Sequence, residues 1–478
     1  MSQNPPPTLL VMKFGGTSVG AAPAIRQAAG IVLDQSPRWG GLVVVVSAMS
    51  GVTDKLVRGA QTAASGDGQT FLQIAAELSE LHTRAAEELL EKGSELHSQF
   101  LNTLDRYLAE FSTLCHSVSV LGELTPRAMD TISGLGERIN ARLFAAVLDQ
   151  QGGLARPIDA SELIVTDDHF QSATPLMSQT RPRALSRLRP LLERGVIPVV
   201  TGFIAANSDG ISTTLGRGGS DYSAAILGDS LDATQVWIWT DVDGVMTADP
   251  RIVPEAQVIP VLSYSEVGEL AYFGAKVLHP RTIRPVIERG IPLWVKNTFN
   301  PDFPGTLIER QAQSVPGTVK AVTAIKALSM VIVEGRGMMG VPGIAARTFG
   351  AVASQGASVL MISQASSEQS ICFIVPQETA QGVMSAVEQE MAVELRRGDI
   401  DSVTAMDDVV IVTAVGAGMR GTPGVAARLF GALGDNGINV IAIAQGASEC
   451  GVSMVIAAQD APEALRRIHA RVILNREN

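Results

Sequence analysis

The chain has 478 residues, of which 46% are hydrophobic and 18% are charged, and its formal net charge is -11. This length allows several domains with a sizeable core, and the composition is typical of a globular protein rather than a disordered one. The negative charge leaves no overall basic field for nucleic acid or an anionic membrane, so local groups must hold any anionic ligand.

The N-terminal residues 1–7 are polar and Pro-rich, without the basic and apolar regions of a secretory signal. No apolar run approaches the roughly 18 residues that span a bilayer. Cys115, Cys372 and Cys450 are scattered without a CxxC pair, and the six histidines lack metal-binding spacing. We therefore expect a cytoplasmic protein with structural histidines and no disulfide framework.

Short apolar runs that end in Gly or Ser predict buried parallel strands at Leu9–Phe14 and Leu42–Ser47, with a helix at Ala22–Leu33 between them. Pro198–Gly202 and Gln235–Thr240 repeat the pattern. The alternation predicts an α/β domain over residues 1–305, with an open, mostly parallel sheet sandwiched by helices. In such sheets ligands bind beyond the carboxyl ends of the strands.

Residues 61–125 differ from their surroundings because they are rich in Ala, Leu, Glu and His and show helical periodicity. They predict a helical insertion packed on the sheet domain, and we expect it to serve shape and interfaces rather than chemistry.

A Pro- and Gly-rich stretch predicts a linker at 306–317, and an internal repeat follows it. Val333–Gly350 aligns without gaps on Ala414–Gly431, and Gln364 aligns on Gln445 in the same register. A match of this length predicts two copies of one module, at 318–400 and 401–478.

Each copy predicts the order strand, Gly-rich turn, helix, strand, strand, helix. The last helix of the second copy is expected to end near Ile468, which leaves little chain for a final strand. Val319–Ile325 is a β-prone run without a place in the first copy. Our hypothesis is that it completes the sheet of the second copy and so interlocks the two.

Lys13–Val19, with the sequence KFGGTSV, follows the first predicted strand. Its glycines allow the backbone N–H groups to approach phosphate oxygens, and Lys13 adds a compact positive charge. It is not a Walker A loop, because Ala21 stands where that motif needs Lys. Taken alone, the stretch is equally compatible with a tight turn beside a surface lysine.

Leu215–Asp221, with the sequence LGRGGSD, places Arg217 between glycines just before a helix. A guanidinium on such a backbone suits bidentate carboxylate binding, and the helix start offers free N–H groups to the same space. A glycine-rich helix start alone would explain the glycines but not the embedded arginine.

Two further stretches are weak signals by themselves. Ser47–Thr53 supplies hydroxyl groups after the second predicted strand, but Ser50 or Thr53 could simply cap a helix. Glu137 could be a first-turn acid that the helix dipole favours.

Together with Thr240–Arg251 (TDVDGVMTADPR) and Gly274–Pro280 (GAKVLHP), these motifs resemble the aspartate kinases of the amino-acid kinase family. The resemblance covers nearly the whole chain except the helical insertion. It implies Mg²⁺- and ATP-dependent phosphorylation of the side-chain carboxylate of L-aspartate, the first step of lysine, threonine and methionine biosynthesis.

The resemblance also implies roles for single residues. Lys13 and Asp221 would be catalytic, and the substrate would be held by Ser47, Thr53, Glu137 and Arg217. The nucleotide would be held by Lys13, Phe14, Gly15, Gly16, Ser18, Gly218, Gly219, Ser220, Thr240, Asp241, Met246, Arg251, Lys276 and Val277. Met246 stands where related sequences often have Tyr, so apolar packing on the base would survive but a phenolic hydrogen bond would not. No direct metal ligand is expected, and Asp221 and Asp241 are candidates for holding Mg²⁺ through water.

Both repeat copies contain a GxGxxG string, at Gly335–Gly340 and Gly416–Gly421. A dinucleotide site is rejected, because prolines sit at the helix starts and no acidic residue follows at the expected distance. The copies instead resemble ACT domains, βαββαβ sensors of amino acids. The resemblance implies effector contacts at Gln364, Gln445, Met338, Gly340, Ile344 and Ser363.

The stretch Ile362–Ile371 is most similar to the regulatory part of bifunctional aspartate kinase–homoserine dehydrogenases, although the sequence ends at Asn478 and we expect no dehydrogenase half. This favours threonine as the inhibitor, with lysine or a joint effect as the rival. ACT domains usually pair through exposed sheet edges, so a homodimer or homotetramer is expected.

Two other functions stay open from the sequence. One is a kinase of the same fold with a glutamate-like, carbamate or nucleotide acceptor, against which Thr53, Glu137 and Arg217 together argue. The other is a non-catalytic amino-acid-binding regulator, against which the intact Lys13, Arg217 and Asp221 argue.

Overall fold

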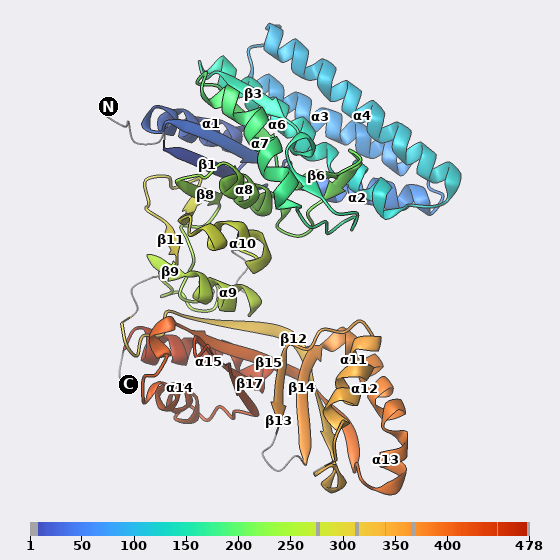
Figure 1. Cartoon of the computed structure of the whole chain (residues 1–478), viewed down its shortest axis with the longest axis vertical. Coiled ribbons are helices and arrows are strands. Elements are labelled where there is room, and N and C mark those ends of the chain that lie inside the picture. The colour runs from blue at the N-terminus through green and yellow to red at the C-terminus, as the bar shows by residue number, and fades with distance from the viewer. Residues whose placement is uncertain are drawn as a thin grey trace. The chain divides into compact units, whose positions relative to one another are not determined.

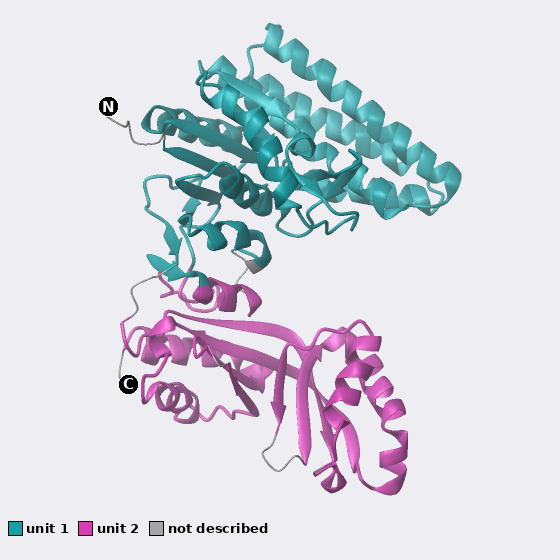
Figure 2. Ribbon diagram, viewed as in Figure 1, with its two compact units in different colours: residues 1–245, 260–264, 278–312 teal, residues 246–259, 265–277, 313–478 magenta. Residues whose placement is uncertain are grey.

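The computed structural model describes residues 8–475 except 274–277, 311–314, 340, 365–368 and 447. The chain forms two compact units (Figure 2). Unit 1 comprises residues 1–245, 260–264 and 278–312, and unit 2 comprises residues 246–259, 265–277 and 313–478. Within the described part of the chain, no helix combines the length and the apolar character needed to cross a membrane.

Unit 1 is built on an eight-stranded sheet (Figure 1). In spatial order its strands are β3 (Ala155–Ile158), β5 (Ile197–Thr201), β2 (Gly41–Val46), β1 (Leu9–Phe14), β8 (Gln235–Thr240), β10 (Leu293–Asn297), β11 (Thr306–Glu309) and β9 (Val261–Ser263). Neighbours run parallel except β10 and β11, and the four strands expected from the sequence are all present. A small second sheet holds β4 (Val165–Thr166), β6 (Ile204–Asn207) and β7 (Ser212–Thr214).

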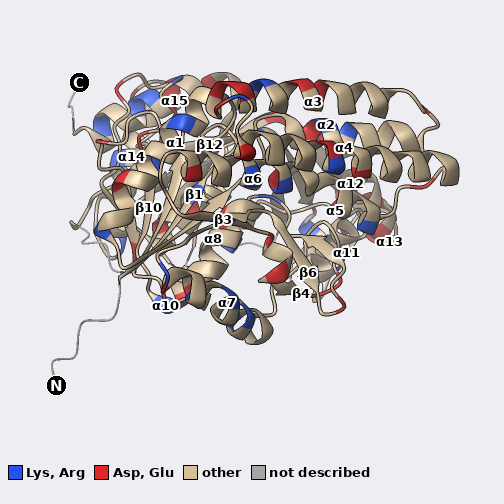
Figure 3. Cartoon of the chain, turned by 90° about the horizontal axis from the view of Figure 1, so that it is seen from above, with Lys and Arg blue, Asp and Glu red and all other residues tan. Residues whose placement is uncertain are grey.

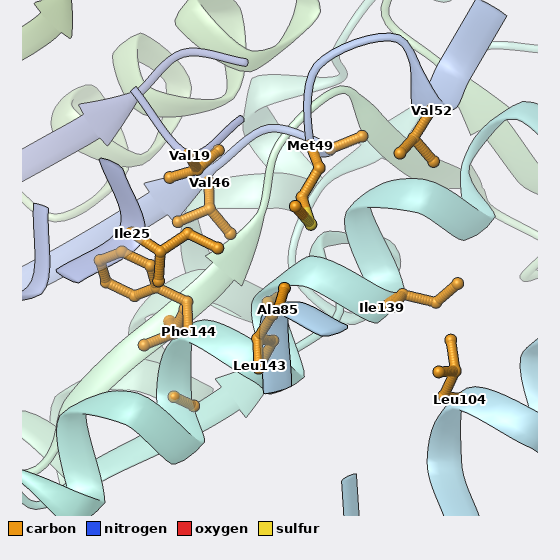
Figure 4. Packing of buried hydrophobic residues seen from close by; sticks show 14 of the residues in the cluster. Val19, Ile25, Val46, Met49, Val52, Ala85, Leu104, Ile139, Leu143 and Phe144 are labelled. Carbon is orange, nitrogen blue, oxygen red and sulfur yellow. The ribbon is translucent and has the colours of Figure 1, made fainter. Parts of the chain in front are cut away.

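Helices cover this sheet because the strands are apolar on both faces; every residue of β1 is buried. They are α1 (Ala22–Gln35), α6 (Leu135–Gln150), α7 (Met177–Leu192), α8 (Gly219–Ser230) and α10 (Pro280–Arg289). Figure 4 shows Val46 and Met49, from the end of β2 and the turn after it, beside Ile139 and Leu143 of α6, and all four belong to one apolar core. The turn after β2 is therefore held in place by its packing against α6.

Residues 61–125, the expected helical insertion, contain the end of α2 (Val52–Ala64) and all of α3 (Thr70–Leu89) and α4 (Glu95–Leu121), and α5 (Pro126–Ser133) follows them. Buried apolar residues of α3 and α4, such as Leu78 and Leu104, join the core that also covers the sheet. Acidic and basic residues are interspersed along these helices (Figure 3). The insertion is thus an amphipathic helical layer.

Unit 2 contains one six-stranded antiparallel sheet. In spatial order its strands are β13 (Met361–Gln364), β14 (Ser370–Pro376), β12 (Ala321–Glu334), β15 (Ser402–Val415), β17 (Gly451–Ala457) and β16 (Ala442–Gln445). Its helices are α11 (Ile344–Ser354), α12 (Gln377–Glu390), α13 (Ala392–Arg397), α14 (Val425–Gly434), α15 (Ala461–Ile468) and, except for its first residue, α9 (Tyr264–Tyr272).

The two central strands of this sheet are long and serve both repeat copies. Ala321–Ile325 in the first half of β12 pairs with Ile411–Val415, whereas Met330–Glu334 pairs with Ser402–Met406. The register shifts between the halves, where Ala327 has a φ of 59. This is the pairing that the interlocking hypothesis requires for Val319–Ile325. The proposed module boundary at residue 400 accordingly precedes a strand that both copies share.

Two segments of the proposed catalytic domain 1–305 group with unit 2 instead, namely 246–259 and 265–277. The physical reason is direct bonding, because Val322 N donates to Thr247 O at 2.8 Å. Glu266 in α9, fully buried, accepts from Lys320 Nζ at 2.9 Å. The sequence pattern did not indicate that these two segments group with unit 2, because both contain ordinary helix and turn residues.

Candidate active site

Lys13 lies at the end of β1, where the strand enters the Gly-rich turn. Its side chain is mostly buried, and its Nζ lies 2.6 Å from Asp221 Oδ1 in α8. Gly15 N donates to Trp239 O at 3.2 Å, and a Cβ on Gly15 would come within 3.2 Å of Lys13 Nζ. Glycine thus leaves more room around the ammonium group, although the lysine end could shift by a few tenths of an ångström to admit a Cβ.

The ends of β2 and β5 meet the start of α8. Ser47 Oγ donates to Ser220 Oγ at 3.0 Å, so the serine after β2 touches the first turn of α8. Gly202 follows β5, and a Cβ there would meet Ser220 Oγ at 2.5 Å. This close approach places the free N–H groups of the α8 N-terminus at the carboxyl ends of the strands, where an anion is stabilised.

Glu137 lies in the first turn of α6, which packs tightly on the turn after β2. A Cβ on Gly136 would approach Ala48 Cβ to 2.8 Å, and Asn140 Nδ2 donates to Ser47 O at 2.6 Å. Burial raises the pKa of Glu137 to about 8, against which backbone N–H groups act weakly. Its Oε2 has no hydrogen-bond partner among the described residues. A buried, unsatisfied carboxyl oxygen of this kind would be satisfied by a cationic ligand.

Arg217 is carried on a turn between two glycines with left-handed backbone conformations, Gly216 with φ 75 and Gly218 with φ 70. Glycine is favoured at both positions because these conformations are strained for other residues. The Arg217 side chain is exposed and makes no hydrogen bond or ion pair with any other described residue. The guanidinium is thus available for an anionic ligand.

These side chains line one cavity of about 290 Å³. The lining residues are Lys13, Ser47, Thr53, Glu137, Phe203, Gly216, Arg217, Gly218, Gly219, Ser220 and Asp221. The cavity therefore contains all four expected substrate contacts and both expected catalytic residues. It combines two basic and two acidic side chains. Such a set can bind an amino acid that carries one ammonium group and two carboxylates.

Phe203 is a cavity residue that the sequence argument missed. It follows Gly202 after β5 and has a φ of 66, a left-handed conformation that is strained for a non-glycine residue. Its N–H donates to Ser223 Oγ of α8 at 3.1 Å, which holds the strained turn. The signal available in the sequence was a strand ending in Thr-Gly-Phe, the same pattern as the other strand ends.

The expected nucleotide residues are only partly brought together. Phe14 is buried and stacks on Trp239 at 5.9 Å between ring centroids, so its side chain belongs to the core. Gly15, Gly16 and Ser18 lie in the turn after β1, and Ser18 Oγ donates to Trp239 O at 3.3 Å. Thr240 is the last residue of β8, which pairs with β1 in the sheet, and Asp241 comes directly after it.

The other expected nucleotide residues lie elsewhere. Met246 and Arg251 belong to unit 2. Arg251 forms a bidentate pair with Asp249, at 2.9 Å from Nε and 2.8 Å from Nη2. Lys276 and Val277 lie outside the described residues.

The expected effector residues occupy equivalent strand ends in unit 2. Gln364 ends β13 and Gln445 ends β16, and both side chains are exposed. Ser363 lies in β13, opposite Cys372. Met338 and Ile344 are buried in the core of the first copy, so they would shape a site rather than face a ligand freely. Gly340 lies outside the described residues.

Across the described ranges, no group of three His, Cys, Asp or Glu side chains is placed to hold a metal ion. Asp221 offers a carboxylate at the cavity and Asp241 an exposed one at the end of β8. Oxygen donors of this kind fit Mg²⁺, which keeps several waters and needs few protein ligands.

Comparison with known proteins places this geometry in a family. A model described as "Amino acid kinase family" matches residues 8–297, and one described as "ACT domain" matches residues 331–391 and 412–472. Bifunctional aspartokinase/homoserine dehydrogenase 2, chloroplastic, of Zea mays is 41% identical over 98% of this chain and 51% of that protein. The chain thus spans about half the length of such curated relatives. Aspartokinase 2, chloroplastic, of Arabidopsis thaliana is 33% identical over 96% of this chain and 83% of that protein.

Solved structures agree with this placement. Escherichia coli aspartokinase III in complex with aspartate and ADP matches with a TM-score of 0.79 and 28% identity, covering 97% of this chain and 99% of that chain. The same enzyme in complex with lysine and aspartate matches with a TM-score of 0.77 and 29% identity. The protein whose cavity is described above therefore belongs to the amino acid kinase family, within the group formed by the aspartokinases.

Proposed function

We propose that this protein is a feedback-regulated aspartate kinase, which transfers the γ-phosphoryl group of ATP to the side-chain carboxylate of L-aspartate and releases ADP. The observation that carries the proposal is the single cavity shared by Lys13, Glu137, Arg217 and Asp221. The related E. coli structure, solved with aspartate and ADP, supports the same substrates.

The reaction needs no general base at the acceptor. A free aspartate side chain has a pKa near 3.9, so it is already ionised at neutral pH. The obstacle is repulsion between this carboxylate and the nucleotide phosphates, about 4 kcal/mol for each charge pair at ~4 Å and an effective dielectric near 20. The protein must therefore supply positive charge and positioning.

Each cavity residue then has a role. Lys13 and the N–H groups of the Gly15–Gly16 turn and of the α8 start bind the transferred phosphoryl group. Arg217 binds the α-carboxylate of aspartate, and Glu137 accepts from its α-ammonium group. In this structure, Lys13 forms an ion pair with Asp221. Nucleotide phosphates would replace Asp221 as the partner of the ammonium group.

Mg²⁺ would neutralise phosphate charge on the nucleotide, and Asp221 and Asp241 are the carboxylates that would hold it, through water. Ser47 and Thr53 supply hydroxyl groups beside the acceptor. The hydrogen bond between Ser47 and Ser220 fixes the turn after β2 relative to the start of α8.

The repeat in unit 2 would sense a product amino acid, with Gln364 and Gln445 selecting its side chain. Threonine stays the effector that the resemblance of Ile362–Ile371 favours, and the E. coli enzyme solved with lysine and aspartate keeps lysine as the rival. We also propose a homodimer or homotetramer, since β13 and β16 are the edge strands of the sheet and each is bonded to one neighbouring strand. We keep the cytoplasm as the proposed location, and the three free cysteines agree with a reducing compartment.

A panel of acceptors tests this function. ADP release should require L-aspartate and Mg²⁺, should be absent or far slower with L-glutamate, carbamate or UMP, and should fall on adding threonine or lysine. Faster ADP release with another acceptor would replace the substrate. Effector binding without ADP release from any acceptor would favour a regulator that has lost its activity.

A further inference from the structure

The turn Asn297–Asn300 leaves the sheet beside the strand that carries the expected nucleotide contacts. β10 runs parallel to β8, with Asn297 opposite Thr240, and Thr298 N donates to Thr240 O at 2.9 Å. The turn thus emerges at the same carboxyl edge as Asp241, where ligands of open α/β sheets bind.

The turn is also bonded to the Gly-rich turn after β1. Thr298 is fully buried, and its Oγ1 donates to Ser18 Oγ at 2.7 Å. Ser18 Oγ in turn donates to Trp239 O in β8. The buried pair of Thr298 and Ser18 hydroxyl groups therefore links the carboxyl ends of β1, β8 and β10.

Asp243 fixes the two ends of the turn. Its Oδ1 accepts from Asn297 Nδ2 at 2.8 Å and from Asn300 Nδ2 at 3.1 Å. Phe299 N donates to Asn297 Oδ1 at 2.9 Å. The backbone on both sides of Phe299 is thus held by side-chain hydrogen bonds rather than left as a free loop.

Packing does not use the side chains that this arrangement presents. Phe299 is 55% exposed, and Val242, next to Asp243, is 38% exposed. Single exposed apolar residues are ordinary on a protein surface, but the Phe299 ring is carried on a bonded turn beside the expected nucleotide contacts and stays open to a ligand. An aromatic face is suited to stacking on a planar base.

Charge decides which part of a nucleotide suits this edge. Asp241 and Asp243 flank Val242. Apart from the Mg²⁺ ion that Asp241 is proposed to hold through water, their carboxylates repel phosphate oxygens and accept from hydroxyl or amino groups. The positive groups Lys13 and Arg217 line the cavity at β1 and α8 instead. The phosphates belong to the cavity, and the ribose and base belong to the β8–β10 edge.

We propose that the Asn297–Asn300 turn is a wall of the nucleotide site and that the Phe299 ring, with Val242, forms the apolar contact to the purine base. This inference rests on the proposed kinase function and assigns the base-binding surface within it. Phe299 is a specificity residue that binds the nucleotide and takes no part in phosphoryl transfer itself.

Equilibrium binding of ADP to the full chain, measured by calorimetry without aspartate, tests the proposal. Phe299→Ala should weaken ADP binding by about 5- to 150-fold, the range of one base–aromatic stack. The KM for ATP should rise in parallel while the KM for aspartate and the unfolding midpoint stay unchanged. Leu121→Ala is the matched control, because Leu121 is 76% exposed on α4 and should change none of these quantities. Unchanged ADP affinity in Phe299→Ala overturns the proposal.

A second variant separates stacking from a general effect on the turn. Phe299→Trp should retain ADP affinity, and its added indole fluorescence should change with ADP but not with inorganic tripolyphosphate. Equal changes with both ligands would contradict a base contact. If the wild-type protein binds ADP but does not phosphorylate aspartate, the proposed function fails while the base contact is still decided by these titrations. If the wild-type protein binds no ADP, both fail.

Discussion

The two units use their sheets in opposite ways. In unit 1 the strands of the central group are parallel, so residues far apart in sequence meet at one edge, and Lys13 reaches Asp221 although the two are separated by most of the unit. In unit 2 the strands are antiparallel, and β12 and β15 each belong to both repeat copies. Parallel strands bring residues from distant parts of the chain to one edge, whereas the shared antiparallel strands join the two repeat copies in one sheet.

The largest effect should come from removing the ammonium group in the unit 1 cavity. Lys13→Ala should lower kcat by about 100- to 1000-fold or more, because one fixed positive group is lost where charge develops. The unfolding midpoint should change little. Lys55→Ala is the matched control, since Lys55 pairs with Glu77 on the insertion and is 40% exposed. A Lys13→Ala variant that keeps most of its turnover would remove Lys13 from the phosphate site.

The shared strands of unit 2 predict that damage to one copy spreads to the other. Leu429 of α14 is fully buried in the second copy, so Leu429→Ala should cost about 2–5 kcal/mol of stability. Hydrogen exchange should then accelerate in β14 of the first copy as well as in β17. Acceleration confined to the second copy would show that the two fold independently.

The repeat should control the rate without contributing to it. Gln364→Ala should relieve amino-acid inhibition by about 5- to 150-fold in effector concentration, the range of ordinary coupling energies. The uninhibited kcat should stay unchanged, because Gln364 ends β13 far along the chain from the cavity residues. Gln445→Ala is the companion variant, and comparing the two inhibition curves would show which copy senses the effector.

The smallest predicted effect is a pH dependence of substrate binding. Burial raises the pKa of Glu137 to about 8, so in the free protein the carboxyl group is largely protonated below that pH. An ammonium ligand needs the ionised form. The KM for aspartate should therefore rise as pH falls below 8, by about tenfold per pH unit, and should level off above 8.

Glu137→Gln is the control for this profile, because glutamine does not titrate and should remove the slope near pH 8 while raising the KM. An identical slope in wild type and variant would assign the pH dependence to another group.

The difference between the units also explains what the sequence could predict. The strand ends Lys13–Gly16, Ser47 and Arg217–Asp221 were predictable, because a buried strand followed by glycine and a polar residue places that residue at a known edge. Phe203 was missed although its strand ends in Thr-Gly-Phe, the same pattern as the other strand ends, because the strain of its backbone is a property of the folded turn. The grouping of 246–259 with unit 2 was not predictable either, since it depends on long-range bonds such as that between Thr247 and Val322. The interlocked strand at Val319–Ile325 stood out only because the repeat left it unassigned.

Trapping of aspartyl phosphate as its hydroxamate is the sharpest test of the proposed phosphoryl transfer. The full chain would be incubated with Mg-ATP, L-aspartate and hydroxylamine, which traps an acyl phosphate as it forms. We expect a hydroxamate of aspartate in amounts equal to the ADP released, formed about 100- to 1000-fold more slowly, or slower still, in Lys13→Ala and reduced by threonine or lysine. ADP release without hydroxamate, or hydroxamate undiminished in Lys13→Ala, would contradict this proposal.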